Sequence, residues 1–142
     1  MVANTDGNEM EVYFSGKKLY GNDFSLDQID AWFADEAEGY FNLTQSGNAE
    51  YTYGYHALNK RHGYSALPKR RFSHVLGIGS AYGDELGPIL DYSDRISILE
   101  PSDGFNKTVL NGVPLSYIKP VSSGDMPFDS SSLDLITCLG VL

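Results

Sequence analysis

The stretch HVLGIGSAYG, residues 74–83, decides the fold of this chain. It begins as an apolar run typical of a buried β-strand and ends abruptly in small residues at positions 77, 79, 81 and 83. Glycine permits a positive φ and leaves no Cβ between the backbone and a neighbouring group. The pattern therefore indicates either a tight turn from a strand into a helix or a place where a ligand lies against bare backbone.

Beyond this turn, short apolar runs alternate with turn residues. We predict strands at 74–79, 95–100, 115–119 and 133–139, and a helix at 83–90 in which Pro88 is an irregularity. Strands separated by helical or irregular connections are typical of a parallel sheet with covered faces. Because crossover connections are right-handed, we expect a doubly wound α/β layer. Ligands of such sheets bind beyond the carboxyl ends of the strands.

The N-terminal half has a helical pattern instead. Ser25 followed by Gln28 is a capping box, and it predicts a helix over 26–38 whose acidic residues face water. A second helix is predicted over 50–63. We therefore divide the chain into an N-terminal helical cap or lid, 1–70, and a sheet domain, 71–142. The group that suggests a lid over the cofactor and acceptor comprises Tyr51, Tyr53, Tyr55, His56 and Asn59, and a plain helical cap packed on the sheet is the alternative.

Composition and charge exclude several classes of function. The chain contains 10 Lys and Arg residues and 19 Asp and Glu residues. Its net charge of −9 disfavours binding to a nucleic-acid backbone. The single cysteine, Cys138, rules out an intramolecular disulfide and a multi-cysteine metal site. The sequence contains neither 18 consecutive apolar residues nor a visible secretion signal, so we expect a cytoplasmic protein with no membrane segment. We also expect no metal.

The second predicted strand ends in a carboxylate, Glu100, which is followed by Pro101. Taken alone, Glu100 is equally well explained as an ordinary strand-end acid. A carboxylate at the tip of the strand next to a glycine turn can accept hydrogen bonds from both hydroxyls of a ribose, so the pair favours a nucleoside site. Tyr82 occupies the place where a dinucleotide fingerprint starting at Gly77 requires glycine or alanine, and no Gly-Lys-Ser/Thr follows for a P-loop.

These residues resemble the class I S-adenosylmethionine-dependent methyltransferases. The resemblance covers about residues 70–142 and is carried by VLGIGSAYG (75–83), by Glu100 and by SGDMPFDSSSLDLI (123–136). It implies a Rossmann-like sheet whose four predicted strands have the order 3-2-1-4. Two positions depart from the family pattern: Gly77 stands where an acidic residue is usual, and Ala81 stands where glycine is usual.

The resemblance also implies a set of S-adenosylmethionine-binding residues. Around the methionine part it implies Gly79, Ser80, Ala81 and Gly83, with Leu139 or Gly140 near the methionine end. Glu100 would hold the ribose, and Pro101 or the residue after it would border the adenine. Asp125 and Met126 would contact the adenine edge, although Gly124-Asp125 is also ordinary turn chemistry.

Family sheets continue with three more strands, so we expect these 142 residues to be the N-terminal portion of such a domain, with an incomplete sheet. Its fourth strand is then an exposed edge that favours self-association or pairing with a C-terminal half, and the fragment alone is expected to be inactive. The leading hypothesis is the cofactor-binding half of a methyltransferase acting on an unidentified acceptor. The alternatives are a non-catalytic nucleoside-binding module and an NAD-dependent oxidoreductase, and no catalytic base is assigned.

Overall fold

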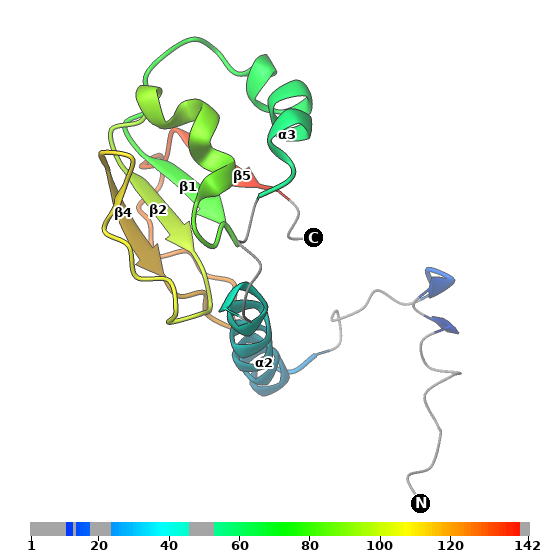
Figure 1. Ribbon diagram of the computed structural model, residues 1–142. Helices are drawn as coiled ribbons and strands as arrows, with labels where there is room; N and C mark the ends of the chain where they lie inside the picture. Colours follow the sequence, from blue (N-terminus) through cyan, green and yellow to red (C-terminus); the bar gives the residue numbers. More distant parts are fainter. Residues whose placement is uncertain (1–10, 13, 18–23, 46–52, 140–142) are drawn as a thin grey trace, which may run out of the picture.

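A five-stranded sheet, parallel except at one edge, forms the centre of the structure (Figure 1). The computed structural model describes residues 11, 12, 14–17, 24–45 and 53–139, with the backbone alone for 36–45. The strands are β1 (Val75–Ile78), β2 (Ile96–Leu99), β3 (Val109–Leu110), β4 (Val113–Ile118) and β5 (Leu135–Cys138). Their order is β3-β4-β2-β1-β5. The predicted α/β, Rossmann-like fold is confirmed, including the relative order of the four predicted strands.

Strand β3 was not expected from the sequence. It forms an antiparallel hairpin with β4, in which Leu110 pairs with Val113. The two residues of the turn, Asn111 and Gly112, have φ values of 47° and 88°. This is the Asn-Gly signature of a tight hairpin, whose turn requires positive φ at both positions. The third predicted strand was therefore placed two residues too late, although the dipeptide signal for the hairpin is present in the sequence.

The main core lies between one face of the sheet and the 3₁₀ helix η2 (Asp84–Tyr92). On the sheet side, Val75, Ile96 and Leu115 are aligned in register across β1, β2 and β4. Helix η2 contributes Leu86, Ile89 and Leu90 to the same cluster. The helix lies where it was predicted but is 3₁₀ rather than α. Pro88 within it lacks the N–H that an α-helical bond would need.

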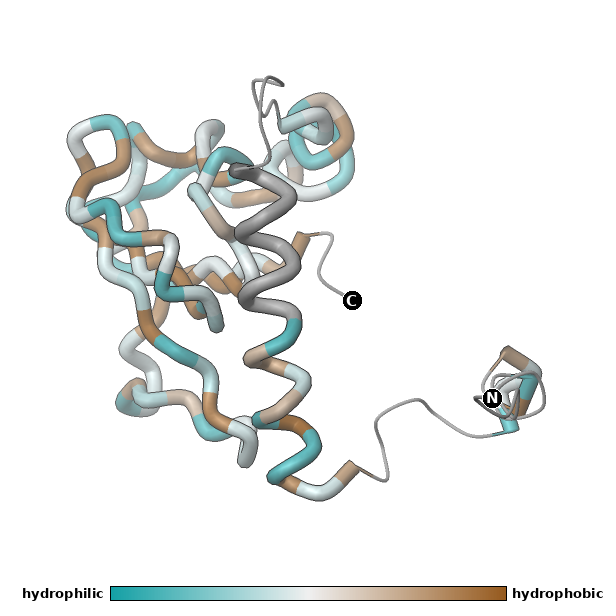
Figure 2. Tube along the Cα trace, turned by 60° about the horizontal axis from the view of Figure 1, so that its bottom comes forward, coloured by the Kyte–Doolittle hydropathy of each residue, from teal (hydrophilic) through white to brown (hydrophobic). Residues whose placement is uncertain are grey.

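Helix α2 (Leu26–Gln45) begins where the capping box predicts. The Ser25 backbone N–H donates to Gln28 Oε1 at 2.9 Å, and the Gln28 N–H donates to Ser25 Oγ at 3.3 Å. The helix continues past the predicted end at residue 38 and includes Gly39, which costs a helix interior only about 1 kcal/mol. Figures 1 and 2 place α2 beside the sheet, and the described part of its trace alternates in hydropathy along its length.

The second predicted helix is shorter than expected. Helix α3 spans His56–His62 and is followed by the 3₁₀ turn η1 (Tyr64–Ala66). Residues 53–55 are not helical, and Tyr51 lies outside the described residues. Within the part of the chain that the structure describes, no helix is long and apolar enough to cross a membrane.

Candidate functional site

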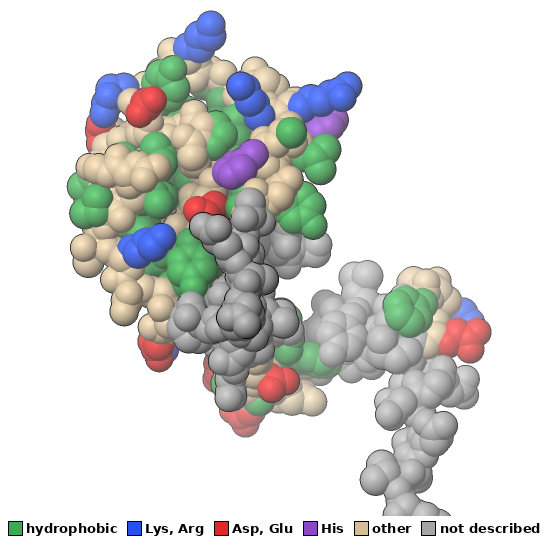
Figure 3. Space-filling model, viewed as in Figure 1, with side chains coloured by type: hydrophobic (Ala, Val, Ile, Leu, Met, Phe, Trp, Pro, Cys, Tyr) green, Lys and Arg blue, Asp and Glu red, His purple; other side chains and the backbone are tan. Residues whose placement is uncertain are grey.

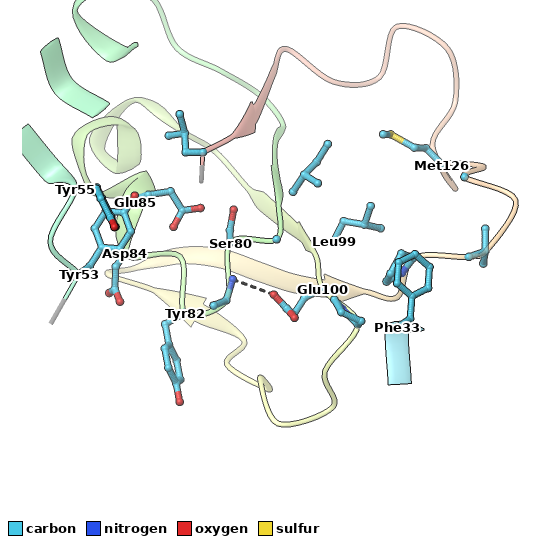
Figure 4. A pocket seen from close by; sticks show the side chains of 18 of the residues that line it. Phe33, Tyr53, Tyr55, Ser80, Tyr82, Asp84, Glu85, Leu99, Glu100 and Met126 are labelled. Carbon is cyan, nitrogen blue, oxygen red and sulfur yellow. Dashed lines mark hydrogen bonds between the residues drawn. The ribbon is translucent and has the colours of Figure 1, made fainter. Parts of the chain in front are cut away.

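A cleft of about 550 Å³ opens at the carboxyl ends of β1 and β2 (Figure 4). Its floor is formed by the segments that follow these two strands, and the connection after β4 closes one side. Aromatic side chains from α2 and from the segment before α3 complete the walls. The lining residues are Trp32, Phe33, Tyr53, Tyr55, Ile78, Gly79, Ser80, Ala81, Tyr82, Asp84, Glu85, Leu99, Glu100, Pro101, Pro120, Val121, Gly124, Met126 and Leu139.

Most of the binding residues expected from the sequence meet at this cleft. The lining includes Gly79, Ser80, Ala81, Glu100, Pro101, Met126 and Leu139. Gly83 and Asp125 are not part of it. The Asp125 side chain is exposed and accepts a hydrogen bond from the Ser123 hydroxyl at 2.7 Å. Gly140 lies outside the described residues.

Gly83 is required by the turn and the core beneath it. Its φ is 79°, and a Cβ at this position would lie 2.7 Å from Leu110 Cδ2 and 3.3 Å from Ile98 Cδ1. A side chain would therefore have to adopt a left-handed backbone conformation and displace the core at once. The small residue at 83 serves the packing of the turn on the hairpin formed by β3 and β4.

Two hydrogen bonds hold Ala81, a residue of the turn after β1 that has a left-handed backbone without being glycine. Ala81 has a φ of 44°, a conformation that costs about 1–2 kcal/mol for a residue with a Cβ. Its N–H donates to Glu100 Oε2 at 3.2 Å, and its carbonyl accepts from the Tyr117 hydroxyl at 2.8 Å. Burial raises the pKa of Tyr117 to about 12, so that this hydroxyl remains a donor at neutral pH. Hydrogen bonds from Tyr117 in β4 and to Glu100 at the tip of β2 thus hold an alanine in this left-handed position.

Glu100 is a buried carboxylate at the tip of β2, with 5% of its surface exposed. Besides the bond from Ala81, Oε1 accepts a hydrogen bond from the Ser102 N–H at 3.4 Å. Burial raises the pKa of Glu100, and the two backbone hydrogen bonds act in the opposite direction. A carboxylate has about four acceptor positions, so two remain for hydroxyl groups of a ligand in the cleft.

A second buried carboxylate, Glu85, was missed by sequence reasoning. It lies in the first turn of η2, lines the cleft and is 5% exposed. Burial raises the pKa of Glu85, the nearby Ser80 side chain acts in the opposite direction, and the charges of Asp84 and Glu100 raise it further. Gly77 makes room for this arrangement, since a Cβ there would overlap the Ser80 side chain. No local motif marks Glu85, because only the fold turns it into the cleft.

The charged side chains that line the cleft all carry the same sign. They are Asp84, Glu85 and Glu100, and no Lys, Arg or His occurs among the described lining residues. On the face shown in Figure 3, basic side chains lie around the sheet domain without forming one continuous patch. In the described segments, no group of three His, Cys, Asp or Glu side chains is arranged to hold a metal ion. The cleft therefore suits a ligand with positive charge and apolar surface.

Tyr53 is the best-anchored residue of the expected lid. Its hydroxyl accepts a hydrogen bond from Asn59 Nδ2, and its ring lies 4.9 Å, centroid to centroid, from that of His56. The centroid of the Tyr55 ring lies 5.9 Å from that of the Tyr53 ring. Tyr53 and Tyr55 line the cleft, while Asn59 and His56 support them from α3. The segment before α3 thus forms a cleft wall.

Comparisons with known proteins include a distant structural likeness. No family model matches the chain, and no curated protein matches it. The chain is similar to part of a solved Haloferax volcanii complex of the Trm112 methyltransferase activator and a candidate methyltransferase, with 22% sequence identity and a TM-score of 0.48. The match covers 78% of this chain and 46% of the other, so this chain spans about half the length of that protein. At this identity and TM-score, the likeness carries no argument about activity.

Proposed function

We propose that this chain carries the S-adenosylmethionine site of a methyltransferase that acts on an unidentified acceptor. The observation that carries the proposal is the convergence of two groups at one cleft. The turn after β1 brings Gly79 and the small residues Ser80 and Ala81 there, and the tip of β2 presents the buried carboxylate of Glu100. Together they match the two ends of a nucleoside that bears an amino-acid tail.

Each part of the cleft fits one part of such a ligand. Glu100 would accept hydrogen bonds from the ribose hydroxyls with its remaining acceptor positions. Met126 lies on the other side of Glu100 from Ser80 (Figure 4), and Pro101 and Met126, which both line the cleft, would border the adenine. Gly79 and Ala81 would lie along the amino-acid tail. When bound, S-adenosylmethionine supplies a methyl group on a positively charged sulfur, and the acidic lining favours that charge.

The negative charge of the side chains that line the cleft argues against a dinucleotide ligand. The pyrophosphate of NAD carries negative charge, and it would face Asp84, Glu85 and Glu100 with no described basic side chain in the lining. Like charges in a partly buried cleft repel strongly. Methyl transfer from an activated sulfonium depends mainly on alignment of the reacting groups, so the proposal requires no assigned base.

Isothermal titration of the chain with S-adenosylmethionine, S-adenosylhomocysteine and NAD tests the proposal. We expect the two sulfur nucleosides to bind and NAD to bind far more weakly. Glu100→Gln should weaken binding by about 1.5–3 kcal/mol, because charge-assisted hydrogen bonds to the ribose are lost. The exposed Glu11→Gln is the matched control. Tighter binding of NAD, or no binding of either sulfur nucleoside, would overturn the proposal.

A further inference from the structure

The cleft contains two buried carboxylates, and the ribose accounts for only one of them. Figure 4 shows that Glu85 and Glu100 lie on opposite sides of Ser80. Glu85 is on the side of Tyr53 and Tyr55, whereas Glu100 is on the side of Met126. A ligand whose ribose is held by Glu100 and whose base extends toward Met126 would therefore direct its other end toward Glu85.

Among the described residues that line the cleft with Glu85, none is Lys, Arg or His, so none carries a compensating positive charge. Glu85 is 5% exposed, and the charges that act on it come from Asp84 and Glu100, both of its own sign. A buried carboxylate without a counter-ion is unfavourable, and a cation that enters the cleft would remove that penalty.

We infer that Glu85 recognises the ammonium group at the amino-acid end of the ligand. The inference rests on the proposed function and assigns a residue to the end of the ligand that Glu100 does not reach. Ser80 lies between the two carboxylates (Figure 4), and Gly77 leaves room for it because a side chain at 77 would occupy the same space. Glu100 would thus bind the ribose and Glu85 the ammonium group of the same ligand.

Three ligands separate the two ends in a titration. S-adenosylmethionine and S-adenosylhomocysteine carry the ammonium group, while 5′-methylthioadenosine has the same nucleoside without the amino-acid tail. We expect Glu85→Gln to weaken binding of the first two by about tenfold or more and to leave 5′-methylthioadenosine unchanged. Glu100→Gln should weaken all three. Asp91→Asn, an exposed change in the same helix η2, is the matched control and should alter none.

Ser80→Ala provides a second variant that keeps the charge of Glu85. It should reduce binding of the two tailed ligands by a smaller factor than Glu85→Gln, again without affecting 5′-methylthioadenosine. Unchanged binding of S-adenosylmethionine by Glu85→Gln, or equal weakening of all three ligands, would overturn the assignment while leaving the proposed function intact. Failure of the unmodified chain to bind any of the three would instead overturn the proposed function, and the assignment with it.

Discussion

The backbone N–H of Ala81 donates a hydrogen bond to Oε2 of Glu100 at 3.2 Å, and this bond joins the turn after β1 to the tip of β2 (Figure 4). Ala81 has a left-handed backbone, and the residue that follows β2 helps to hold it there. The candidate ribose ligand is therefore also part of the scaffold that shapes the turn. Binding and folding are coupled at this pair.

The Tyr117 hydroxyl supports the same turn from β4, where it donates to the Ala81 carbonyl at 2.8 Å. We predict that Tyr117→Phe lowers the free energy of unfolding by about 0.5–1.5 kcal/mol, because the carbonyl loses its side-chain donor. Urea denaturation measures the change. The exposed Tyr92→Phe removes an equivalent hydroxyl and should have no effect. Equal stability of Tyr117→Phe and the unmodified chain would contradict the role given to this bond.

Gly83→Ala should destabilise the fold by about 2 kcal/mol or more. The alanine must adopt a φ of 79°, and its Cβ would lie 2.7 Å from Leu110 Cδ2. Gly87→Ala is the matched control within η2, because its Cβ would meet nothing within 4 Å and its φ is not positive. The control should be neutral or stabilising by up to about 1 kcal/mol. Thermal unfolding of both variants decides the point, and a Gly83→Ala protein as stable as Gly87→Ala would refute it.

Glu85→Gln should stabilise the unliganded fold at neutral pH. Burial raises the folded-state pKa of Glu85 above its ordinary value of 4.5, so its ionisation opposes folding as the pH rises through the folded-state value. The variant has no charge to bury. We expect its melting temperature to exceed that of the unmodified chain at neutral pH and the difference to disappear below pH 4.5. A lower melting temperature at neutral pH would show that the charge is already compensated.

The affinity for a cationic ligand should depend on pH with the opposite sign. Both Glu85 and Glu100 must be ionised to attract a cation, and burial raises the pKa of each. As the pH falls through these raised values, we expect affinity for S-adenosylmethionine to decline at a higher pH than an exposed carboxyl would cause. Titrations at several pH values measure the profile. It should be flatter in Glu85→Gln, and an identical profile in both proteins would exclude Glu85 as the titrating group.

Asp134 should contribute to the stability of the fold in a way that depends on pH. Its Oδ2 accepts hydrogen bonds from the N–H groups of Ser73 at 2.7 Å and His74 at 3.3 Å, and these bonds, helped by Arg70, lower its pKa below the ordinary 3.8. The stabilisation is present above pH 3.8 and is lost as the pH falls through the folded-state value. Asp134→Ala should therefore melt at a lower temperature at neutral pH, with the difference vanishing in acid. The exposed Asp129→Ala should not change the melting temperature.

Much of the fold could be predicted because its signals are local. The apolar run that ends at residue 79, the spacing to Glu100 and the capping box at Ser25 each depend on neighbours in the chain, and the structure contains the corresponding strands and helix start. The hairpin of β3 and β4 was missed, although the dipeptide Asn111-Gly112 is typical of a tight hairpin turn. The type of η2 was also missed, since Pro88 and the packing of the helix on the sheet together decide it.

Local patterns in the sequence predicted four of the five strands and the two backbone segments that meet at the cleft, and the family resemblance implied the relative order of those four strands. Tertiary structure alone decided which side chains face that cleft, because a side chain's direction depends on how distant segments pack. It directed Glu85 into the cleft, left Asp125 exposed and set Gly83 against Leu110. It also collected acidic lining residues without a described basic partner, and this shared sign of charge is the property on which the proposed ligand depends.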